Sequence, residues 1–438
     1  MGHNSSSYNG SNSLRDGWRR FGQHLATIGL SILFLSISHA QQRIEQPASV
    51  ERIPPVLLDT LHPAPALESQ KLPVYELKMQ AKALAELENS ETKTNTYPAT
   101  FTANGVVYEG IGVRFRGEWA RSWPKKPLKV IFKKEKPFDG HHSLNLNSAW
   151  RDPSFLRETL AYGVYAMCGV PASKSRMAQV IVNGNFRGLY VEVEQPDEAF
   201  LKRVGLPGVV LYKAASDPHW ADERDLGSDE VFATHYKLET HKTNGMSDLR
   251  MFCHDLAKTK DVTTFFNERV DLDKYINYLV ATTLVQHWDC FNKNHYMAYE
   301  PKTKKWFAVP WDLDRTFGDH WHGGFTQAQL PILQGTRPLP GPTGWNRMED
   351  RFFSSPMLKA KFMKRLGEVL EQDFTSDKLF PLIDTMAAQI QEQAPMDRAR
   401  WPGPARSLQN GIAGVKSYIQ RRRTFLLAEV ARFQSDSK

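Results

Sequence analysis

The chain has 438 residues, of which 41% are hydrophobic and 24% are charged, and this length is enough for a large core or two lobes. Its formal net charge of +8 suits anionic ligands but is too small to indicate a nucleic-acid-binding protein. The three cysteines form no Cys-x-x-Cys pair, which argues against a disulfide framework and against a zinc site.

The N-terminal region resembles a leader followed by a linker. A basic segment precedes the apolar run 25–40, and Ser38-x-Ala40 fits a signal-peptide cleavage site. We therefore expect a signal peptide over residues 1–40, with an uncleaved anchor as the alternative. The apolar run is shorter than the roughly 20 residues that a spanning helix needs. Residues 41–72 are rich in Pro and polar residues and predict a linker. This pattern indicates an exported protein, in the periplasm, at the cell surface or outside the cell, with no stable membrane span after cleavage.

The next region is rich in predicted strands. Asn104-Gly105 is a typical hairpin turn between two β-rich arms. A helix is predicted between the strands, with Asp152 as its N-cap and Gly169 as its end. The predicted elements are a hairpin over 99–117, a strand over 127–132, the helix over 151–169, a second hairpin over 177–195 and a strand over 209–214.

Beyond residue 245 the pattern becomes mainly helical. Residues 271–288 are apolar at helical spacing, two short strands over 295–311 enclose a turn, and helices are predicted from about 350 onwards. The chain therefore predicts an α+β fold, with a β-rich N-lobe over about 73–215 and a helical C-lobe over about 216–435.

One stretch carries the pattern of a phosphoryl-transfer site. Protein kinases use a loop Asp to accept the substrate hydroxyl proton, an Asn five residues later to hold Mg²⁺, and a second Asp after a hairpin to hold Mg²⁺ as well. His287-x-Asp289-x₄-Asn294 has this spacing, and Asp312 follows the predicted hairpin. Residues 312–318 then stand where a kinase has Asp-Phe-Gly. For His287 we favour a structural role within the loop.

The same carboxylates have a purely structural alternative. Asp289 and Asn294 could cap a helix end and a turn, while Asp312 and Asp314 could pair with Arg315.

A kinase also needs a cation for the nucleotide phosphates, held by a Glu of the N-lobe helix. Lys129 lies in the predicted strand 127–132 and Glu158 lies in the predicted helix, so both could serve. Lys129 is equally an ordinary strand lysine, and Glu158 could pair with a neighbouring Arg.

The turn over residues 116–126 stands where a phosphate-covering loop would lie. It has one Gly, so it is not a Gly-rich loop, and Arg116, Arg121, Ser122 and backbone N–H groups would have to hold phosphate oxygens. Lys125 and Lys126 in the same turn could equally be surface charges.

Five stretches in the same order resemble the CotH family, the spore-coat-protein-H-like kinases. They are GVRFRGEWARSWPKKPLKVIF, DPSFLRETLAYGVYAMCGVPAS, VNGNFRGLYVEVEQPDEAFL, HWDCFNKNHYMAYE and FAVPWDLDRTFG, and they extend from about residue 73 to at least 320. The resemblance implies a secreted atypical protein kinase with a two-lobed kinase-like fold over about 73–435. Such a kinase would use ATP and Mg²⁺ or Mn²⁺ to phosphorylate Ser or Thr of an exported protein.

The resemblance also implies residue roles. Asp289 would be the catalytic Asp, Asn294 and Asp312 the metal ligands with Asp314 as a further candidate, Lys129 the phosphate-binding lysine with Glu158 as its partner, and Glu194 and Gln195 residues near the adenine.

Two other functions remain open. The chain could be an exported structural or assembly protein on a kinase-like scaffold, because ATP is scarce outside the cytoplasm. A glycosyltransferase is suggested by Asp312-Leu313-Asp314 after an apolar strand, since such a pair can hold a metal-bound sugar nucleotide. That hypothesis leaves Asp289 and Asn294 without a role.

We predict that residues 1–71 are dispensable for folding and nucleotide binding, because apart from the apolar run they offer no periodic pattern that could add to a core. A chain that starts at Leu72 should stay soluble and bind nucleotide as well as one that starts at Gln41. Aggregation of the shorter chain alone would show that the linker assignment is wrong.

Overall fold

The computed structural model describes residues 72–215, 219–241, 245–319, 328–333, 336, 345–403 and 407–436. All of them belong to one compact unit of the chain, Pro55–Lys438. The signal peptide expected over 1–40 lies outside the described residues, and so does the expected linker apart from Leu72.

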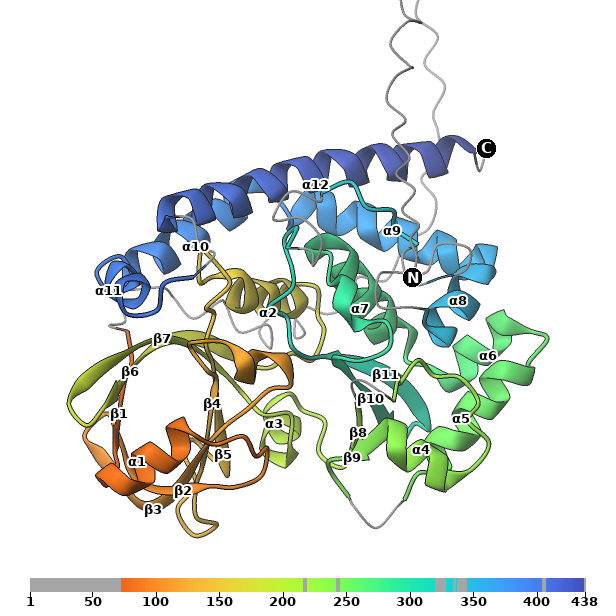
Figure 1. Cartoon of the computed structure of the whole chain (residues 1–438). Helices are drawn as coiled ribbons and strands as arrows, with labels where there is room; N and C mark the ends of the chain where they lie inside the picture. Colours follow the sequence, from red (N-terminus) through yellow and green to blue (C-terminus); the bar gives the residue numbers. More distant parts are fainter. Residues whose placement is uncertain are drawn as a thin grey trace, which may run out of the picture. The chain divides into compact units, whose positions relative to one another are not determined.

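The first seven described strands close into a barrel, in the order β1-β2-β3-β4-β5-β7-β6 (Figure 1). The barrel is closed by the parallel pairing of β1 with β6, while its other neighbours are antiparallel. Alternate side chains such as Phe101, Val113 and Val130 are buried in its core. The strands are β1 (Val74–Lys78), β2 (Tyr97–Ala103), β3 (Val106–Phe115), β4 (Leu128–Ile131), β5 (Ser143–Asn147), β6 (Ser175–Val182) and β7 (Asn185–Val193).

Both predicted hairpins are confirmed. Asn104 and Gly105 join β2 to β3 with φ of 50° and 76°, and Asn183 and Gly184 join β6 to β7 with φ of 50° and 77°. A positive φ at both central residues is what a type I′ turn requires, and Asn-Gly is the pair that adopts it most readily.

A second, antiparallel sheet has the order β11-β10-β8-β9. Its strands are β8 (Val210–Ala214), β9 (Tyr236–Leu238), β10 (His295–Glu300) and β11 (Lys305–Pro310). Because β8 pairs with β10 and β9, it belongs with this sheet and not with the barrel. The boundary between the two groups of strands therefore lies before Val210, earlier than the position near residue 215 that we expected.

Helices make up most of the remaining described chain, so the mixed α+β arrangement is confirmed. The long helix α7 lies centrally, where α2, α9 and β11 pack against it, and α12 runs along α9 and α10 (Figure 1). None of the described helices is long and apolar enough to cross a bilayer. The helices are α1 (Ala81–Glu88), α2 (Arg157–Met167), α3 (Glu198–Arg203), α4 (Asp229–His235), α5 (Ser247–Lys258), α6 (Val262–Arg269), α7 (Leu272–Val285), α8 (Arg347–Ser354), α9 (Pro356–Gln372), α10 (Ser376–Gln389), α11 (Gln393–Arg400) and α12 (Leu408–Asp436).

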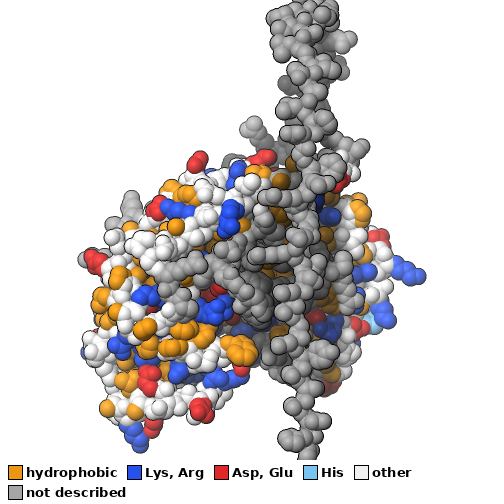
Figure 2. Space-filling model, turned by 45° about the horizontal axis from the view of Figure 1, so that its top comes forward, with side chains coloured by type: hydrophobic (Ala, Val, Ile, Leu, Met, Phe, Trp, Pro, Cys, Tyr) orange, Lys and Arg blue, Asp and Glu red, His pale blue; other side chains and the backbone are white. Residues whose placement is uncertain are grey.

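The surface and the cysteines agree with the composition. On the face shown in Figure 2, Lys and Arg side chains of the described residues are interspersed with Asp and Glu side chains. The three cysteines are buried and free, as expected for a chain without a disulfide framework.

Helix α2 begins later than the sequence indicates. We expected Asp152 to cap a helix that starts beside it, but the helix begins at Arg157. The Asp152 carboxylate instead accepts the backbone N–H groups of Ser154 and Arg157, both at 2.9 Å, which holds the intervening residues in a turn. The predicted end is confirmed, because Gly169 follows the helix with a φ of 85°.

A buried ion pair joins the barrel to the C-terminal helices. Lys125, which we considered a possible surface charge, is fully buried, and its ammonium lies 2.5 Å from Oδ2 of Asp397 in α11. The same oxygen accepts the N–H of Leu189 in β7 at 2.8 Å. A β-carbon at Gly188 would lie 2.5 Å from that oxygen, so only glycine leaves room for the pair.

We predict that Asp397→Ala lowers the free energy of unfolding by about 3–5 kcal/mol, because it leaves a buried ammonium without its counter-charge. The double variant Lys125→Met/Asp397→Leu should recover most of the loss, since it removes both charges. Urea unfolding measures each value.

The control is Lys93→Met, which breaks the ion pair with Glu118 whose side chains are 56% and 44% exposed. Such a surface pair contributes about 0–1 kcal/mol. An Asp397→Ala loss no larger than this would contradict the stabilising role of the buried pair.

Candidate active site

The loop that follows α7 brings Asp289 and Asn294 together. Gln286 ends the helix in the left-handed conformation, with φ of 54°, and a short 3₁₀ turn, Trp288–Cys290, carries Asp289. The Asn294 amide donates to both the backbone oxygen and Oδ2 of Asp289, at 3.0 Å each. The Asp289 side chain is almost fully buried. The spacing of the two residues therefore places them in direct contact.

The hairpin of β10 and β11 returns the chain beside this loop. His295 pairs with Pro310 in the register, and the N–H of Trp311 donates to the Asn294 carbonyl at 3.1 Å. Asp312 follows directly. Asn294 and Asp312 have φ of 57° and 58°, a left-handed conformation that Asn and Asp adopt more readily than most residues. The hairpin thus places Asp312 next to Asn294.

A hydrogen-bond network supports the loop from behind. Glu223 lies 2.8 Å from Nε2 of His295, and its other oxygen accepts from the Asn346 amide. Asn346 also donates to the Phe291 carbonyl at 2.8 Å. Because these groups are buried, the network fixes the backbone on both sides of Asn294.

Four carboxylates gather on this side of the site. Burial, followed by the negative charges of Asp314 and Asp312, raises the pKa of Glu158 well above its ordinary value. Burial and then the charge of Asp312 raise the pKa of Asp314 in the same way. Asp289 contributes to the field at Asp314 as well. The proximity of these acids therefore favours the protonated forms of Glu158 and Asp314 when no cation is bound.

The alternative in which Arg315 pairs with Asp312 or Asp314 holds in part. The Arg315 guanidinium donates its hydrogen bond to Oδ2 of Asp319 at 3.0 Å. Burial lowers the pKa of Arg315, but the charge of Asp314 raises it more than that of Asp319 does, and Arg315 in turn limits the rise in the pKa of Asp314. Arg315 therefore attracts Asp314 while its hydrogen bond goes to Asp319.

Cationic side chains converge from the barrel. The Arg116 guanidinium lies 5.6 Å from the Trp311 ring, next to Asp312. Lys129 in β4 donates to Oε1 of Gln195 at 3.2 Å. Burial, and then the charges of Arg116 and Lys213, lower the pKa of Lys129 to about 7. The three cations come from different elements, yet the charges of Arg116 and Lys213 reach Lys129 and lower its pKa.

No ion pair joins Lys129 to Glu158 among the described side chains, although we expected one. Asn147 stands between the two groups of charges, since its amide donates to Glu158 at 2.7 Å and its oxygen accepts from Arg116. Sequence reasoning missed Asn147. The alternating stretch Ser143–Asn147 could have revealed it, because Asn145 and Asn147 place two amides on one face of a strand.

The two residues expected near the adenine take different positions. Glu194 is held by other groups: its oxygens accept from Arg203 at 2.8 Å and from the Lys174 N–H at 2.8 Å, and lie 3.3 Å from His141. Of the two residues, Gln195 is the one that contacts another candidate, because its side-chain oxygen accepts from Lys129.

Ser122 lies in a short 3₁₀ turn, Trp119–Ser122, and is exposed. Its hydroxyl donates to the Trp119 carbonyl at 2.7 Å, so the structure does not bring it to the other candidates. In the same turn the Arg121 side chain donates to the Gly117 carbonyl at 2.9 Å. Local hydrogen bonds therefore shape this turn.

Lys293 is a further residue that sequence reasoning missed. Its ammonium lies 3.1 Å from Oδ1 of Asp289. Burial raises the pKa of Asp289 to about 6, and the Lys293 charge limits this rise. The sequence does contain an indication of this pair, because Lys293 lies four residues after Asp289.

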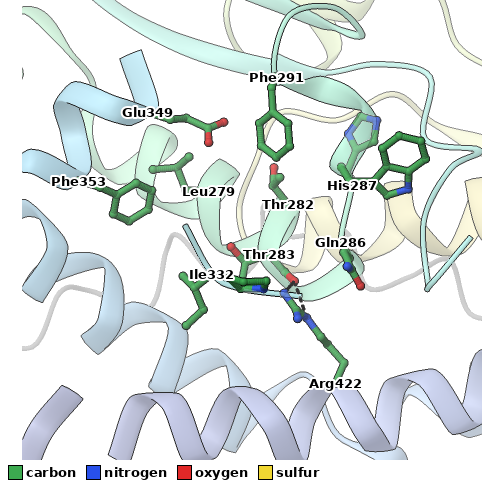
Figure 3. Close-up of a pocket in the computed structure, with 12 residues that line it drawn as sticks. Leu279, Thr282, Thr283, Gln286, His287, Phe291, Ile332, Glu349, Phe353 and Arg422 are labelled. Carbon is green, nitrogen blue, oxygen red and sulfur yellow. Dashed lines mark hydrogen bonds between the residues drawn. The ribbon is translucent and has the colours of Figure 1, made fainter. Parts of the chain in front are cut away.

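A small cavity lies behind the loop, between α7, α8 and α12 (Figure 3). His287, Gln286 and Glu349 line it together with Arg422, which donates to the Thr283 carbonyl at 3.0 Å. Its volume of 20 Å³ suits about one water molecule, far below the roughly 300 Å³ of a ligand pocket. Burial lowers the pKa of His287 to about 3, so this imidazole is neutral.

Comparison with known proteins adds the family. A family model described as CotH kinase protein matches residues 113–426. The chain belongs to the CotH kinase protein family. Inner spore coat protein H of Bacillus subtilis (strain 168) is 27% identical over 333 residues, which cover 74% of this chain and 89% of that protein. Inner spore coat protein H-like protein of the same organism is 22% identical over 299 residues, covering 68% and 84%.

A solved complex of HipA, HipB and operator DNA from Shewanella oneidensis MR-1 is 12% identical. It covers 84% of this CotH-family chain and 74% of its own, with a TM-score of 0.29. At that score the similarity supports no conclusion about fold or function.

The metal role of Asn294, Asp312 and Asp314 stays a prediction. In the part of the chain that the structure describes, no three His, Cys, Asp or Glu side chains form a metal-binding group. The predicted set combines two carboxylates with one amide, a combination of oxygen donors that suits Mg²⁺ or Mn²⁺.

We predict that His141 makes stability depend on pH between about 6.5 and 9. Burial alone lowers the pKa of His141, but hydrogen bonds to Asp197 and Glu194 outweigh it and raise the pKa from 6.5 to about 9. The protonated form is favoured in the folded state, so its contribution is complete below pH 6.5 and is lost as the pH rises towards 9.

Urea midpoints at pH 6, 7.5 and 9, for the parent chain and for His141→Asn, measure this effect. The difference between the two should shrink as the pH rises. Parallel profiles would show that the ion pairs of His141 do not stabilise the fold.

Proposed function

We propose that the chain is a protein kinase that transfers the γ-phosphate of ATP to a Ser or Thr hydroxyl of an exported protein. The observation that carries this proposal is the joining of Asp289, Asn294 and Asp312 by the loop and the hairpin. A base beside metal ligands is what phosphoryl transfer needs, and the contact of Asn294 with Asp289, with Asp312 following Trp311, supports that assignment. The family description contains the word kinase, which supports phosphoryl transfer but does not name the acceptor.

The charges of the site fit a nucleotide with its metal. Asp312, Asp314 and Asn294 would hold Mg²⁺ or Mn²⁺, which neutralises charge on the phosphates when it is bound. The repulsion that raises the pKa of Asp314 is the repulsion that a divalent cation would relieve. Lys129, whose pKa is lowered by burial and by the charge of Arg116, would hold the phosphate oxygens together with Arg116.

Asp289 is the residue that would act on the substrate hydroxyl. With a pKa of about 6 the carboxylate is mostly ionised at neutral pH, so it can accept a proton. Asn294 fixes the orientation of its Oδ2, and Lys293 faces its Oδ1. Both contacts hold the carboxylate in place for the attacking oxygen.

The proposal includes a kinase-like arrangement in which the barrel forms one lobe and the second sheet with its helices forms the other. Lys129 and Arg116 would act from the first lobe, and Asp289 and Asp312 from the second. The names of both Bacillus relatives refer to a spore coat, which supports a coat or surface location for this chain.

The same names also favour a second candidate, a structural coat or surface protein without turnover. The glycosyltransferase alternative gains no support, because Asp312 follows an antiparallel hairpin and not an alternating β–α unit. Phosphotransfer from labelled ATP in the presence of Mn²⁺ or Mg²⁺ separates the kinase from the structural protein.

We predict that Asp289→Asn lowers the phosphotransfer rate about 10²–10⁴-fold, the usual contribution of a general base. It should leave the affinity for metal·ATP nearly unchanged, because the lost proton acceptor acts in the transition state. Asp312→Ala should instead remove metal-dependent ATP binding. Calorimetry with a non-hydrolysable analogue and a label-transfer assay give the two values.

Asp273→Asn, in the exposed first turn of α7, is the matched control and should change neither value. Full activity of Asp289→Asn would refute its catalytic role. An absence of label on any protein, including the chain itself, would favour the structural protein.

A further inference from the structure

We infer that Lys213 is a second phosphate-binding lysine, which acts with Lys129 and Arg116 on the polyphosphate of a nucleotide. This inference rests on the proposed function and adds a residue that the sequence did not indicate. It rests on three observations: the position of Lys213 in the second sheet, the aromatic rings that its ammonium faces, and the lack of an anion paired with it among the described residues.

Lys213 lies in β8, in the interior of the second sheet. It is paired with Tyr296 of β10 on one side and with Lys237 of β9 on the other. Residues opposite one another on neighbouring strands project from the same face of a sheet. The ammonium accordingly lies 5.9 Å from the Tyr296 ring and 5.1 Å from the Trp311 ring.

These two rings place Lys213 within the candidate site. Trp311 directly precedes Asp312 and also faces Arg116 at 5.6 Å. The Tyr296 hydroxyl accepts from Gln195 at 3.4 Å, and Gln195 accepts from Lys129 at 3.2 Å. Lys213 and Lys129 therefore approach the same group of side chains from the second sheet and from the barrel.

Lys213 has no anionic partner of its own. Within the described ranges, no hydrogen bond or ion pair reaches its ammonium. The acid that acts on it most strongly, Glu239, is paired with Lys237 at 2.8 Å. Lys213 is partly buried, and the two aromatic rings attract its ammonium. Arg116 and Lys237 repel it, so an anion that joined these groups would stabilise its charged form.

A polyanion would supply the missing counter-charge better than a single carboxylate. Three cations, Arg116, Lys129 and Lys213, repel one another here, and burial lowers the pKa of Lys213 to about 8. A chain of phosphates can contact several cations at once, and a metal at Asp312 would contact the same phosphates. The ligand class is thus a nucleoside di- or triphosphate.

The test is the affinity of Lys213→Met for an imido analogue of ATP, for adenosine and for inorganic tripolyphosphate, measured by calorimetry with Mg²⁺. Loss of one charged hydrogen bond should weaken binding of the analogue and of tripolyphosphate about 10- to 100-fold. Binding of adenosine should not change. Lys213→Gln serves as a second variant, and Lys305→Met, in the neighbouring strand β11, is the matched control.

A merely structural role gives a different result. Because Met removes an uncompensated ammonium, the melting temperature without ligand should stay the same or rise, while the increase caused by the ATP analogue should shrink. A lower melting temperature together with unchanged affinity for the analogue would overturn the inference, as would an equal loss of adenosine binding.

The outcomes also separate the inference from the proposed function. If the parent chain binds tripolyphosphate through Lys213 but transfers no phosphate, the kinase proposal fails and the anion site stands. If it transfers phosphate and Lys213→Met binds the analogue as the parent does, the inference alone fails. If the parent chain binds neither polyanion, both fail.

Discussion

The buried pair of Lys125 and Asp397 constrains the turn that leads from Arg116 to the strand of Lys129. It links the turn between β3 and β4 to α11, and Asp397 holds β7 through the Leu189 N–H. The turn and its flanking strands carry Arg116 and Lys129, whereas Asp289 lies in the 3₁₀ turn after α7 and Asp312 lies just after β11. A buried charge pair tolerates little displacement, because separating its members leaves each without compensation in a medium of low polarity. The turn that precedes Lys129 is thus held against β7 and α11.

Apart from the pair of Asp289 and Lys293, the charged side chains of the site form one acidic and one cationic group. Glu158, Asp312 and Asp314 repel one another on one side, and Lys129, Lys213 and Arg116 repel one another on the other. The amides of Asn147 and Asn294 contact the charged groups without cancelling them. This arrangement stores unfavourable electrostatic energy in the free protein, which a ligand with both positive and negative parts would release. It is a pattern expected of a binding site and not of a stabilising core.

Local signals in the sequence were sufficient for part of this structure. Asn-Gly pairs gave both hairpins, and the spacing from Asp289 to Asn294 gave two residues in contact. Contacts between distant parts of the chain could not be predicted from local sequence patterns. The barrel closes through the pairing of β1 with β6, and Lys125 pairs with Asp397, which lies 272 positions away. Lys213 was missed because only the pairing of β8 with β10 turns its face towards Trp311. The start of α2 was misplaced because the Asp152 carboxylate serves a turn.

The distance along the chain between Lys125 and Asp397 has a consequence for synthesis. A ribosome makes the chain from its N-terminus, so the barrel strands are synthesised long before α11. Asp397, the counter-charge of Lys125, is translated 272 positions after it. The barrel can collapse early, but the turn between β3 and β4 cannot form its ion pair until α11 has been made. An incomplete chain that lacks α11 therefore leaves the Lys125 ammonium without its counter-charge.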